Sequence, residues 1–311
     1  MTRHFLRDDD LSPAAQAAVL SLAAELKADR FKERPLEGPQ TVAILFDKPT
    51  LRTQASFTSG VAELGGFPMI IDARLAQVGT RESVADTARV LGRQASAIVW
   101  RTFHQSSLEE MAEYAGVPVV NALTDEFHPC QVLADLLTIQ EHQGELAGRK
   151  LAFFGDSASN MAHSYLLGGA TAGMHVAVSG PVGFEPDAAV LAKAQEIAGT
   201  TGGSASYDPD PIDAVTGADV VATDTWVSMG KEGEAGQRLE RFRPYAVTTD
   251  LLTKASPDAV VLHCLPAYRG KEIAAEVIDG PQSVVWDEAE NRLHAQKAVL
   301  TWLLEEREVP Q

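Results

Sequence analysis

The stretch TVAILFDKPTLRTQ, residues 41–54, joins an apolar, β-branched run to a turn and to the start of an amphipathic run. Residues 41–46 have the composition of a buried strand, and the run after the turn ends at Gly65-Gly66. This order predicts a strand, a tight turn and a helix. Pro49 restricts the backbone at the start of the turn, and Thr50 is the predicted N-cap of the helix.

The predicted helix start carries groups that bind anions. Thr50 and Thr53 supply hydroxyls, and Arg52 supplies a planar guanidinium with five donors. The first amides of any helix also point outward, and the helix dipole places partial positive charge there. Such a start favours a phosphate. An ordinary capped helix with a surface arginine is the alternative, and this stretch alone leaves both open.

The composition limits the class of protein. The chain has 311 residues, 45% of them hydrophobic, so we expect a large core and about two domains. Lysine plus arginine number 26 against 43 aspartate plus glutamate, which gives a net charge of −17. This acidic balance argues against binding of nucleic acid or of an anionic membrane. An anionic substrate would therefore need a local cluster of arginines.

The N-terminus, the apolar segments and the cysteines indicate in which compartment the protein is expected. The first ten residues end in an acidic triplet and have no apolar signal-peptide core. No window approaches the roughly 18–20 apolar residues that span a bilayer. The two cysteines, Cys130 and Cys264, do not make a disulfide framework. These features predict a cytoplasmic enzyme or binding protein.

Strand-like and helix-like runs alternate along the chain. Besides residues 41–46, strands are predicted at 68–72, 97–100, 118–122, 150–155, 175–179, 219–223, 259–263 and 283–286. Helices are predicted at 12–29, after the opening turn, and at 81–95, 107–115, 128–143, 160–172, 188–198 and 289–306. Such alternation predicts an α/β protein with two doubly wound parallel sheets.

The glycine-bounded segment 144–148 predicts the boundary between two domains, residues 1–143 and 144–291, joined by long helices. The last helix, from 292 to 311, is expected to return to the first domain. Polar clusters follow the strand-like runs, at 50–53, Arg101, 128–131, 156–160, Asp224 and 263–264. Because ligands in parallel sheets bind beyond the carboxyl ends of the strands, we expect a site between the two domains.

Each polar residue also has a structural interpretation. His128 before a proline is a possible helix cap, and Cys264 at a strand end is a possible small buried side chain. Arg101 is a possible surface charge, and Asp224 a possible loop cap. The cysteine and histidine spacing predicts no zinc site. The sequence contains no G-x-G-x-x-G loop after a strand, so no nicotinamide cofactor is expected.

Together and in this order, the clusters resemble the aspartate/ornithine carbamoyltransferase (transcarbamoylase) family, in its ornithine branch. The matching motifs are Arg101-Thr102-Phe103, His128-Pro129-Cys130-Gln131 with Leu133-Ala134-Asp135, Asp224 with Ser228-Met229-Gly230, His263-Cys264-Leu265-Pro266, and Glu288-Ala289-Glu290-Asn291-Arg292-Leu293-His294. One such motif alone is a weak signal, whereas the ordered set covers nearly the whole chain and is specific.

The resemblance implies transfer of the carbamoyl group of carbamoyl phosphate to the δ-amine of L-ornithine, which yields citrulline for arginine biosynthesis. It implies a carbamoyl phosphate domain followed by an ornithine domain, no cofactor, and a homotrimer or a multiple of trimers. The alternatives are a sister enzyme that uses putrescine or an acylated ornithine, and a relative that binds ligand without turnover. Asp224 with the Ser228-Met229-Gly230 loop favours free ornithine.

Site residues follow from the resemblance, position by position. The phosphate of carbamoyl phosphate would be held by Thr50, Leu51, Arg52 and Thr53, and its carbamoyl end by Arg101, His128 and Gln131, while Arg292 would return from the last helix to carbamoyl phosphate. Gln77 would reach the ligand of a neighbouring subunit. Ornithine would be bound by Asn160, Asp224, Ser228 and Met229, with Cys264 and Leu265 between the two ligands. The implied catalytic residues are Arg101, His128, Asp224 and Cys264.

The chain departs from the family pattern at two places. The first motif is usually Ser-Thr-Arg-Thr-Arg, whereas here it reads Thr50-Leu51-Arg52-Thr53-Gln54. Thr50 keeps a hydroxyl and Leu51 still offers a backbone amide, but Gln54 removes a positive charge. Ser157 and Ser159 also stand where glycine and asparagine are usual.

The Gln54→Arg variant tests the first departure. We expect a lower KM for carbamoyl phosphate, because an added positive charge near an anion site attracts the ligand. Steady-state kinetics with carbamoyl phosphate varied at saturating ornithine measures this change. An unchanged KM would mean that the missing charge is compensated elsewhere in the chain.

Overall fold

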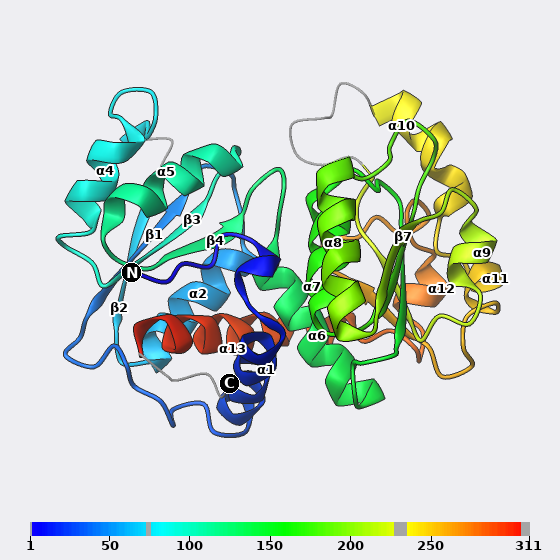
Figure 1. The fold of residues 1–311 in the computed structure, drawn as a ribbon, viewed down its shortest axis with the longest axis horizontal. Helices are drawn as coiled ribbons and strands as arrows, with labels where there is room; N and C mark the ends of the chain where they lie inside the picture. Colours follow the sequence, from blue (N-terminus) through cyan, green and yellow to red (C-terminus); the bar gives the residue numbers. More distant parts are fainter. Residues whose placement is uncertain (1, 73–75, 227–234, 306–311) are drawn as a thin grey trace. The chain divides into compact units, whose positions relative to one another are not determined.

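Two helices, α6 (Pro129–Gln143) and α13 (Val285–Leu304), each run through the border between the two compact units of the chain (Figure 1). Unit 1 comprises Met1–Leu137 and Glu290–Gln311, and unit 2 comprises Thr138–Ala289. The structure is a computed structural model that describes residues 2–72, 76–226 and 235–305. Within these ranges, no helix combines the length and apolarity that a bilayer-spanning segment needs.

Unit 1 is built on a four-stranded parallel sheet with the order β2-β1-β3-β4. Its strands are β1 (Thr41–Phe46), β2 (Phe67–Asp72), β3 (Ala97–Arg101) and β4 (Val119–Leu123). Its helical elements are η1 (Asp8–Asp10), α1 (Pro13–Ala28), α2 (Arg52–Glu63), α4 (Val84–Leu91) and α5 (Gln105–Ala115), with the adjoining parts of α6 and α13. Phe46 pairs with Arg101, so the central strands β1 and β3 end level with one another.

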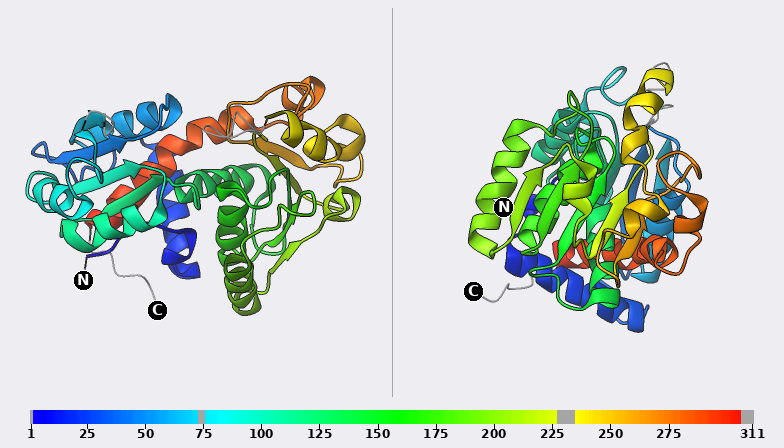
Figure 2. Two further views of the ribbon diagram at one scale, coloured as in Figure 1. Left: turned by 90° about the horizontal axis from the view of Figure 1, so that it is seen from above. Right: turned by 90° about the vertical axis from the view of Figure 1, so that its right-hand side faces the viewer.

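The two faces of the unit 1 sheet bury different partners. Ala43, Leu45, Ile98 and Trp100 pack against α4 and α5 in one apolar cluster. Because successive side chains of a strand point to opposite faces, Arg101 points away from the face that Trp100 occupies. Figures 1 and 2 show α2 on that second face, across the sheet from α4 and α5. The last residue of β3 is thereby directed toward the start of α2.

Unit 2 is built on a five-stranded parallel sheet with the order β7-β6-β5-β8-β9. Its strands are β5 (Lys150–Phe154), β6 (His175–Ser179), β7 (Ser204–Tyr207), β8 (Val220–Thr223) and β9 (Val260–His263). Its helical elements are α7 (Asn160–Thr171), α8 (Ala188–Thr201), α9 (Pro211–Val215), α10 (Ala235–Phe242), η3 (Arg243–Tyr245), α11 (Thr249–Leu252) and α12 (Ala275–Ile278). Phe154 pairs with Thr223 and Thr223 with His263, so three central strands also end level.

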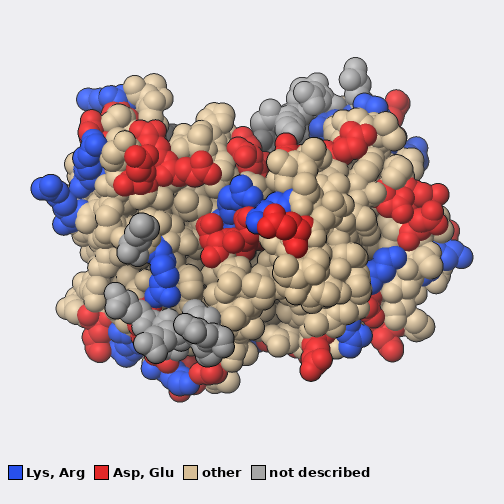
Figure 3. Space-filling view, in the orientation of Figure 1, with Lys and Arg blue, Asp and Glu red and all other residues tan. Residues whose placement is uncertain are grey.

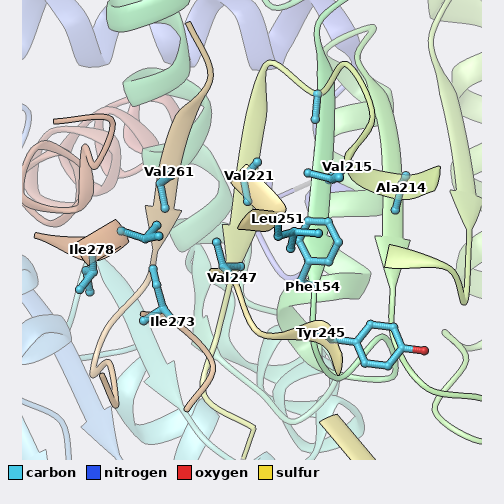
Figure 4. Close-up of a cluster of buried hydrophobic side chains, with 14 of the residues drawn as sticks. Phe154, Ala214, Val215, Val221, Tyr245, Val247, Leu251, Val261, Ile273 and Ile278 are labelled. Carbon is cyan, nitrogen blue, oxygen red and sulfur yellow. The ribbon is translucent and has the colours of Figure 1, made fainter. Parts of the chain in front are cut away.

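The apolar core of unit 2 holds the carboxyl ends of β5, β8 and β9 level with one another. Phe154, Val221 and Val261 project from β5, β8 and β9 into one buried cluster (Figure 4). Leu251 from α11 and Ile278 from α12 close the cluster on its other side. Each fully buried side chain of this size contributes roughly 1.5–3 kcal/mol, so the cluster holds the strands in register. The residues after the strands are then held at defined positions.

The sequence predicted this α/β arrangement with two parallel sheets, and three local predictions were wrong. Thr50 is not the N-cap of α2: Leu51 occupies that position in the αR region, without a side-chain cap. Residues 283–286 are not a strand, because Ser283 makes only an isolated bridge with Val261 and α13 begins two residues later. Helix α8 continues to Thr201, beyond its predicted end at residue 198, and the strand β7 that follows it was not predicted.

Gly92 provides a test of the packing in unit 1. It ends α4, and a Cβ at this position would lie 1.7 Å from the backbone oxygen of Ala115 at the end of α5. We expect Gly92→Ala to destabilise the protein by about 1–3 kcal/mol, since the two helices must move apart. Differential scanning calorimetry measures the change in Tm.

The matched control is Gly199→Ala in α8, where no atom lies within 4 Å of the added Cβ. Alanine is favoured over glycine within a helix by about 0.5–1 kcal/mol, so this variant should melt at or above the wild-type temperature. A Gly92→Ala protein that melts like Gly199→Ala would contradict the close approach of α4 and α5.

Candidate functional site

The carboxyl ends of β1 and β3, the start of α2 and helix α13 meet at one hydroxyl group in unit 1. The backbone amide of Asp47 donates to the oxygen of Arg101 at 2.9 Å, which joins the two strand ends. Arg101 Nη1 donates to Thr53 Oγ1 at 3.3 Å, and Arg292 Nη2 donates to the same oxygen at 3.4 Å. Two guanidinium groups from distant parts of the chain therefore converge on Thr53.

A chain of hydrogen bonds fixes Arg292 from its other side. Arg292 Nη1 donates to Gln131 Oε1 at 2.5 Å, and Gln131 Nε2 donates to Asp135 Oδ1 at 2.8 Å. All three side chains are buried. A carboxylate accepts hydrogen bonds and cannot donate them, so Asp135 binds the NH2 group of Gln131. The amide oxygen of Gln131 then faces the guanidinium of Arg292.

His128 lies near these positive charges, which contribute to the shift of its pKa. Burial lowers the pKa of His128 well below the ordinary value of 6.5, and the positive charges of Arg292, Arg101, Arg52 and Lys48 lower it further. The imidazole is therefore neutral at pH 7. We call Lys48, Arg52, Thr53, Arg101, His128, Gln131 and Arg292 the cationic cluster.

Lys48 has partners that the sequence motif did not reveal. Its side chain is buried, forms an ion pair with Asp125, and places Nζ 4.5 Å from the centre of the Phe103 ring. A cation over an aromatic face is stabilised electrostatically. Lys48 is thus held beside the strand ends that Asp47 and Arg101 join, and it adds a fourth positive charge to the cluster.

The cationic cluster concentrates positive charge in a chain whose net charge is −17. On the face drawn in Figure 3, acidic and basic side chains are interspersed. The charge that an anion requires is consequently supplied locally, by groups held at low exposure where water screens them less. The arrangement favours a compact, multiply charged anion at the start of α2.

Three other predicted residues of unit 1 lie outside this set of contacts. Thr50 is partly buried, and the side chain of Leu51 is 79% exposed, so Leu51 offers the cluster its backbone. Gln77 lies in an exposed loop with φ of +52°, and no contact of its side chain with the cationic cluster occurs among the described residues. Its predicted reach toward a neighbouring subunit is not tested by a single chain.

Unit 2 carries a second polar group at the ends of β8 and β9. Cys264 Sγ donates to Asp224 Oδ1 at 3.1 Å, and the amide of Thr225 donates to the same oxygen at 2.6 Å. Burial raises the pKa of Asp224, while the hydrogen bonds from Cys264 and from the amide of Thr225 oppose the rise. We refer to Asp224, His263, Cys264, Leu265 and Glu272 as the Asp224 cluster.

Both ring nitrogens of His263 are engaged. Its Nδ1 accepts from the amide of Leu265 at 2.9 Å, so the neutral ring carries its proton on Nε2. Nε2 then donates to Glu272 Oε1 at 3.3 Å. Leu265 has φ of +56°, a left-handed conformation that costs a residue with a β-carbon about 1–3 kcal/mol. The contact with His263 holds the backbone in that conformation.

Asp224, His263 and Cys264 also raise the question of a metal. Their ligand atoms all lie within 4.8 Å of one another, a grouping that spacing did not reveal because it combines two strand ends. A metal would have to displace Leu265 or Glu272 from His263 and the thiol proton from Cys264. The contacts instead describe a hydrogen-bonded network that presents a carboxylate and a thiol.

Arg238 is a buried residue of unit 2 that the sequence analysis missed. It forms an ion pair with Asp156, after β5, and its Nε donates to the backbone oxygen of Trp226 at 2.8 Å. It therefore ties the segment after β8 to the turn that precedes Asn160, the first residue of α7. No local signal marks Arg238, because α10 alternates charged and apolar residues like a solvent-exposed helix. Ser228 and Met229 lie outside the described residues.

Known proteins resemble the chain over nearly its full length. Residues 3–141 match the family described as aspartate/ornithine carbamoyltransferase, carbamoyl-P binding domain, and residues 147–303 match its Asp/Orn binding domain. A protein of Clavibacter sepedonicus named ornithine carbamoyltransferase is 66% identical over 304 residues, 98% of this chain and 99% of that protein.

Solved structures give the same result. The ornithine carbamoyltransferase of Pyrococcus furiosus is 44% identical, has a TM-score of 0.94, and is matched over 99% of this chain and 98% of that one. The ornithine carbamoyltransferase of Gloeobacter violaceus is 48% identical with a TM-score of 0.89, over 97% of this chain and 99% of that one.

The neutral state of His128 predicts a pH dependence of stability. The unfolded chain has a histidine pKa of about 6.5, whereas the folded pKa is lower, so the folded state binds fewer protons. The contribution of His128 to stability is therefore fully present above pH of about 6.5 and is lost as the pH falls below it. We expect His128→Gln to lose less of its unfolding free energy between pH 7.5 and 5.5 than the wild type.

Urea unfolding at the two pH values measures this difference. His104→Gln is the control, since His104 is exposed and makes no side-chain cap to α5. The control should lose the same free energy as the wild type. An equal loss in the wild type and in His128→Gln would contradict the proposed neutral imidazole.

Proposed function

The chain belongs to the aspartate/ornithine carbamoyltransferase family, and we infer that it transfers the carbamoyl group of carbamoyl phosphate to the δ-amine of L-ornithine. The products are L-citrulline and phosphate, in a step of arginine biosynthesis. The observation that carries this conclusion is the convergence of Arg101 and Arg292 on Thr53 at the start of α2. It supplies an anion site in the domain whose relatives bind carbamoyl phosphate.

We assign the phosphate of carbamoyl phosphate to the start of α2. A hydroxyl has one donor and two acceptor positions, and Thr53 Oγ1 accepts from both Arg101 and Arg292. The hydroxyl proton of Thr53 therefore remains to donate to a ligand. The amides of the first turn of α2, beginning at Arg52, add further donors, and the backbone of Thr50 and Leu51 leads into that turn.

Arg101, His128 and Thr53 are the proposed donors to the carbamoyl oxygen. Attack of the amine makes this oxygen negative in the tetrahedral intermediate, and donors aimed at it lower the barrier. His128 acts there as a neutral N–H donor, since its pKa is too low for it to be a protonated acid at pH 7. Gln131, held between Arg292 and Asp135, is placed to bind the carbamoyl end as well.

The Asp224 cluster is the proposed site for the amine of ornithine. A free alkylamine has a pKa near 10, yet only the neutral amine attacks. Cys264 donates its thiol proton to Asp224, and we propose that its sulfur accepts from an amine N–H of the substrate. The amine nitrogen forms the new bond to the carbamoyl carbon as the bond to the phosphate oxygen breaks, and the leaving phosphate accepts the proton that the amine releases.

The remaining assignments are proposals of the same kind. Asn160, at the first position of α7, and Ser228 and Met229 would bind the amino-acid end of ornithine, and Leu265 would lie between the ligands. A cytoplasmic location stays a prediction from the sequence.

We further propose a homotrimer or a multiple of trimers, in which Gln77 completes the site of a neighbouring subunit. Support comes from the edge strand β2, on which Phe67 is 56% and Ile70 40% exposed. Large apolar side chains on an exposed sheet edge are typical of a subunit contact.

Citrulline formation tests the function. With carbamoyl phosphate fixed, we expect turnover with L-ornithine and little with putrescine or an N-acylated ornithine. Arg101→Ala should reduce kcat/KM by at least about 100-fold, because a donor to the developing oxyanion is lost, while Tm stays near the wild-type value.

Arg93→Ala is the matched control, since Arg93 is an exposed arginine of the same unit. It should retain wild-type activity. An absence of carbamoylated product with every amine acceptor would exclude the transferase, and preference for another amine would reassign the substrate. A large fall in Tm for Arg101→Ala would point to a structural role for that residue.

A further inference from the structure

A buried ion pair joins α2 to α13 at the end of α2 opposite the cationic cluster. Lys297 is fully buried, and its Nζ donates to Glu63 Oε2 at 2.8 Å and to the backbone oxygen of Arg30. The guanidinium of Arg30 binds the same carboxylate. Burial raises the pKa of Glu63, but the hydrogen bonds from Arg30 and Lys297 outweigh it and lower the pKa. Glu63 is therefore ionised and paired.

Gly60 allows the two helices to approach closely at this pair. A Cβ on Gly60 would lie 3.1 Å from Lys297 Cγ and 3.5 Å from Leu293 Cδ1. The aliphatic part of Lys297 thus crosses α2 at the one residue in that turn without a side chain. Any other residue would push against Lys297, so the position of α13 on α2 is defined by contact as well as by charge.

The same two helices carry three of the seven residues of the cationic cluster, Arg52, Thr53 and Arg292. Thr53 lies in the first turn of α2 and Glu63 is its last residue, about 15 Å further along the helix axis. Arg292 and Lys297 are five residues apart on α13 and meet Thr53 and Glu63 respectively. The helices are consequently fixed to one another at two points. A shift of α13 along α2 or a rotation about its axis would alter both contacts together.

The contact at Thr53 and the ion pair at Glu63 have opposite effects on the position of Arg292. At the Thr53 end, Arg292 and Arg101 bring like charges to one hydroxyl, which favours movement of Arg292 away from the cluster. At the Glu63 end, Lys297 meets an opposite charge in a buried setting, and breaking the pair would leave an uncompensated buried charge. The ion pair of Lys297 with Glu63 therefore resists the movement of Arg292 that charge repulsion at Thr53 favours.

We propose that Lys297 is a positioning residue for carbamoyl phosphate: its ion pair with Glu63 sets the register of α13 on α2 and so holds Arg292 against Thr53. This inference rests on the proposed function for the identity of the ligand. Lys297 touches neither substrate, and it acts on affinity for the phosphate through Arg292. It should leave the binding of ornithine unaffected.

The test is a double-mutant cycle with inorganic phosphate as the probe. Lys297→Met keeps the length of the side chain against Gly60 and removes its charge. We expect calorimetry to give about 5–10-fold weaker phosphate binding, the loss typical of one disturbed hydrogen bond. Kinetics should show a matching rise in the KM for carbamoyl phosphate, with the KM for ornithine within about twofold of wild type.

The decisive comparison uses Arg292→Met as the second variant. If Lys297 acts through Arg292, the double variant should bind phosphate no more weakly than Arg292→Met alone. Additive losses would overturn the proposal. Glu63→Gln removes the opposite charge with little change of shape, and it should weaken phosphate binding in the same direction. It is the substitute if Lys297→Met does not fold.

Gly92→Ala separates positioning from general destabilisation, because it disturbs α4 and α5 of the same unit without contacting α2 or α13. It should lower Tm and leave phosphate binding unchanged, and an equal loss of affinity in Gly92→Ala would overturn the proposal. If wild-type protein binds phosphate but makes no citrulline from ornithine, the proposed function fails. The cycle then still decides whether Lys297 positions Arg292.

Discussion

The anion site of unit 1 is organised around the hydroxyl of Thr53, where two guanidinium groups meet. Positive charges this close repel one another, and burial removes much of the water that would screen them. Their convergence is maintained by groups outside the cluster: Asp135 through Gln131, and Glu63 through Lys297. The resulting site is preorganised for an anion, whose arrival would relieve the repulsion instead of requiring the protein to rearrange.

The groups at the strand ends of unit 2 differ in chemistry from the cationic cluster of unit 1. Its strand ends present a carboxylate, a thiol and a neutral imidazole, with proton positions set by hydrogen bonds from Leu265 and to Glu272. In the proposed function, Asp224 attracts the positively charged amine and the sulfur of Cys264 accepts from its neutral form. Under that proposal, the sheet of unit 1 binds the phosphate and the sheet of unit 2 prepares the nucleophile.

The sequence was most informative where a function depends on a strand end. Strands 41–46 and 175–179 were predicted with their observed limits, and the polar residues after the strands do gather at the sheet edges. Prediction failed where local preference opposed packing: the β-branched pair Val284-Val285 favours a strand, yet Val285 starts a helix and fills the unit 2 core. It also failed for partners distant in sequence, such as Arg238 with Asp156 and Lys297 with Glu63. A charged residue on a helix carries no local mark of whether its partner is water or a buried carboxylate.

The path of α13 has a consequence for the order in which the chain acquires its parts during synthesis. Unit 2 is one uninterrupted segment, Thr138–Ala289, whereas unit 1 receives Arg292 and Lys297 only after all of unit 2 has been made. At about 5–20 residues per second, a ribosome needs on the order of 10–30 s to make that segment. During this interval the first 137 residues lack the contacts that α13 makes with Gly60 and Glu63. They also lack the buried side chains of α13, such as Leu300 and Trp302, so the apolar surface that packs against α13 stays open to water until the last helix is made.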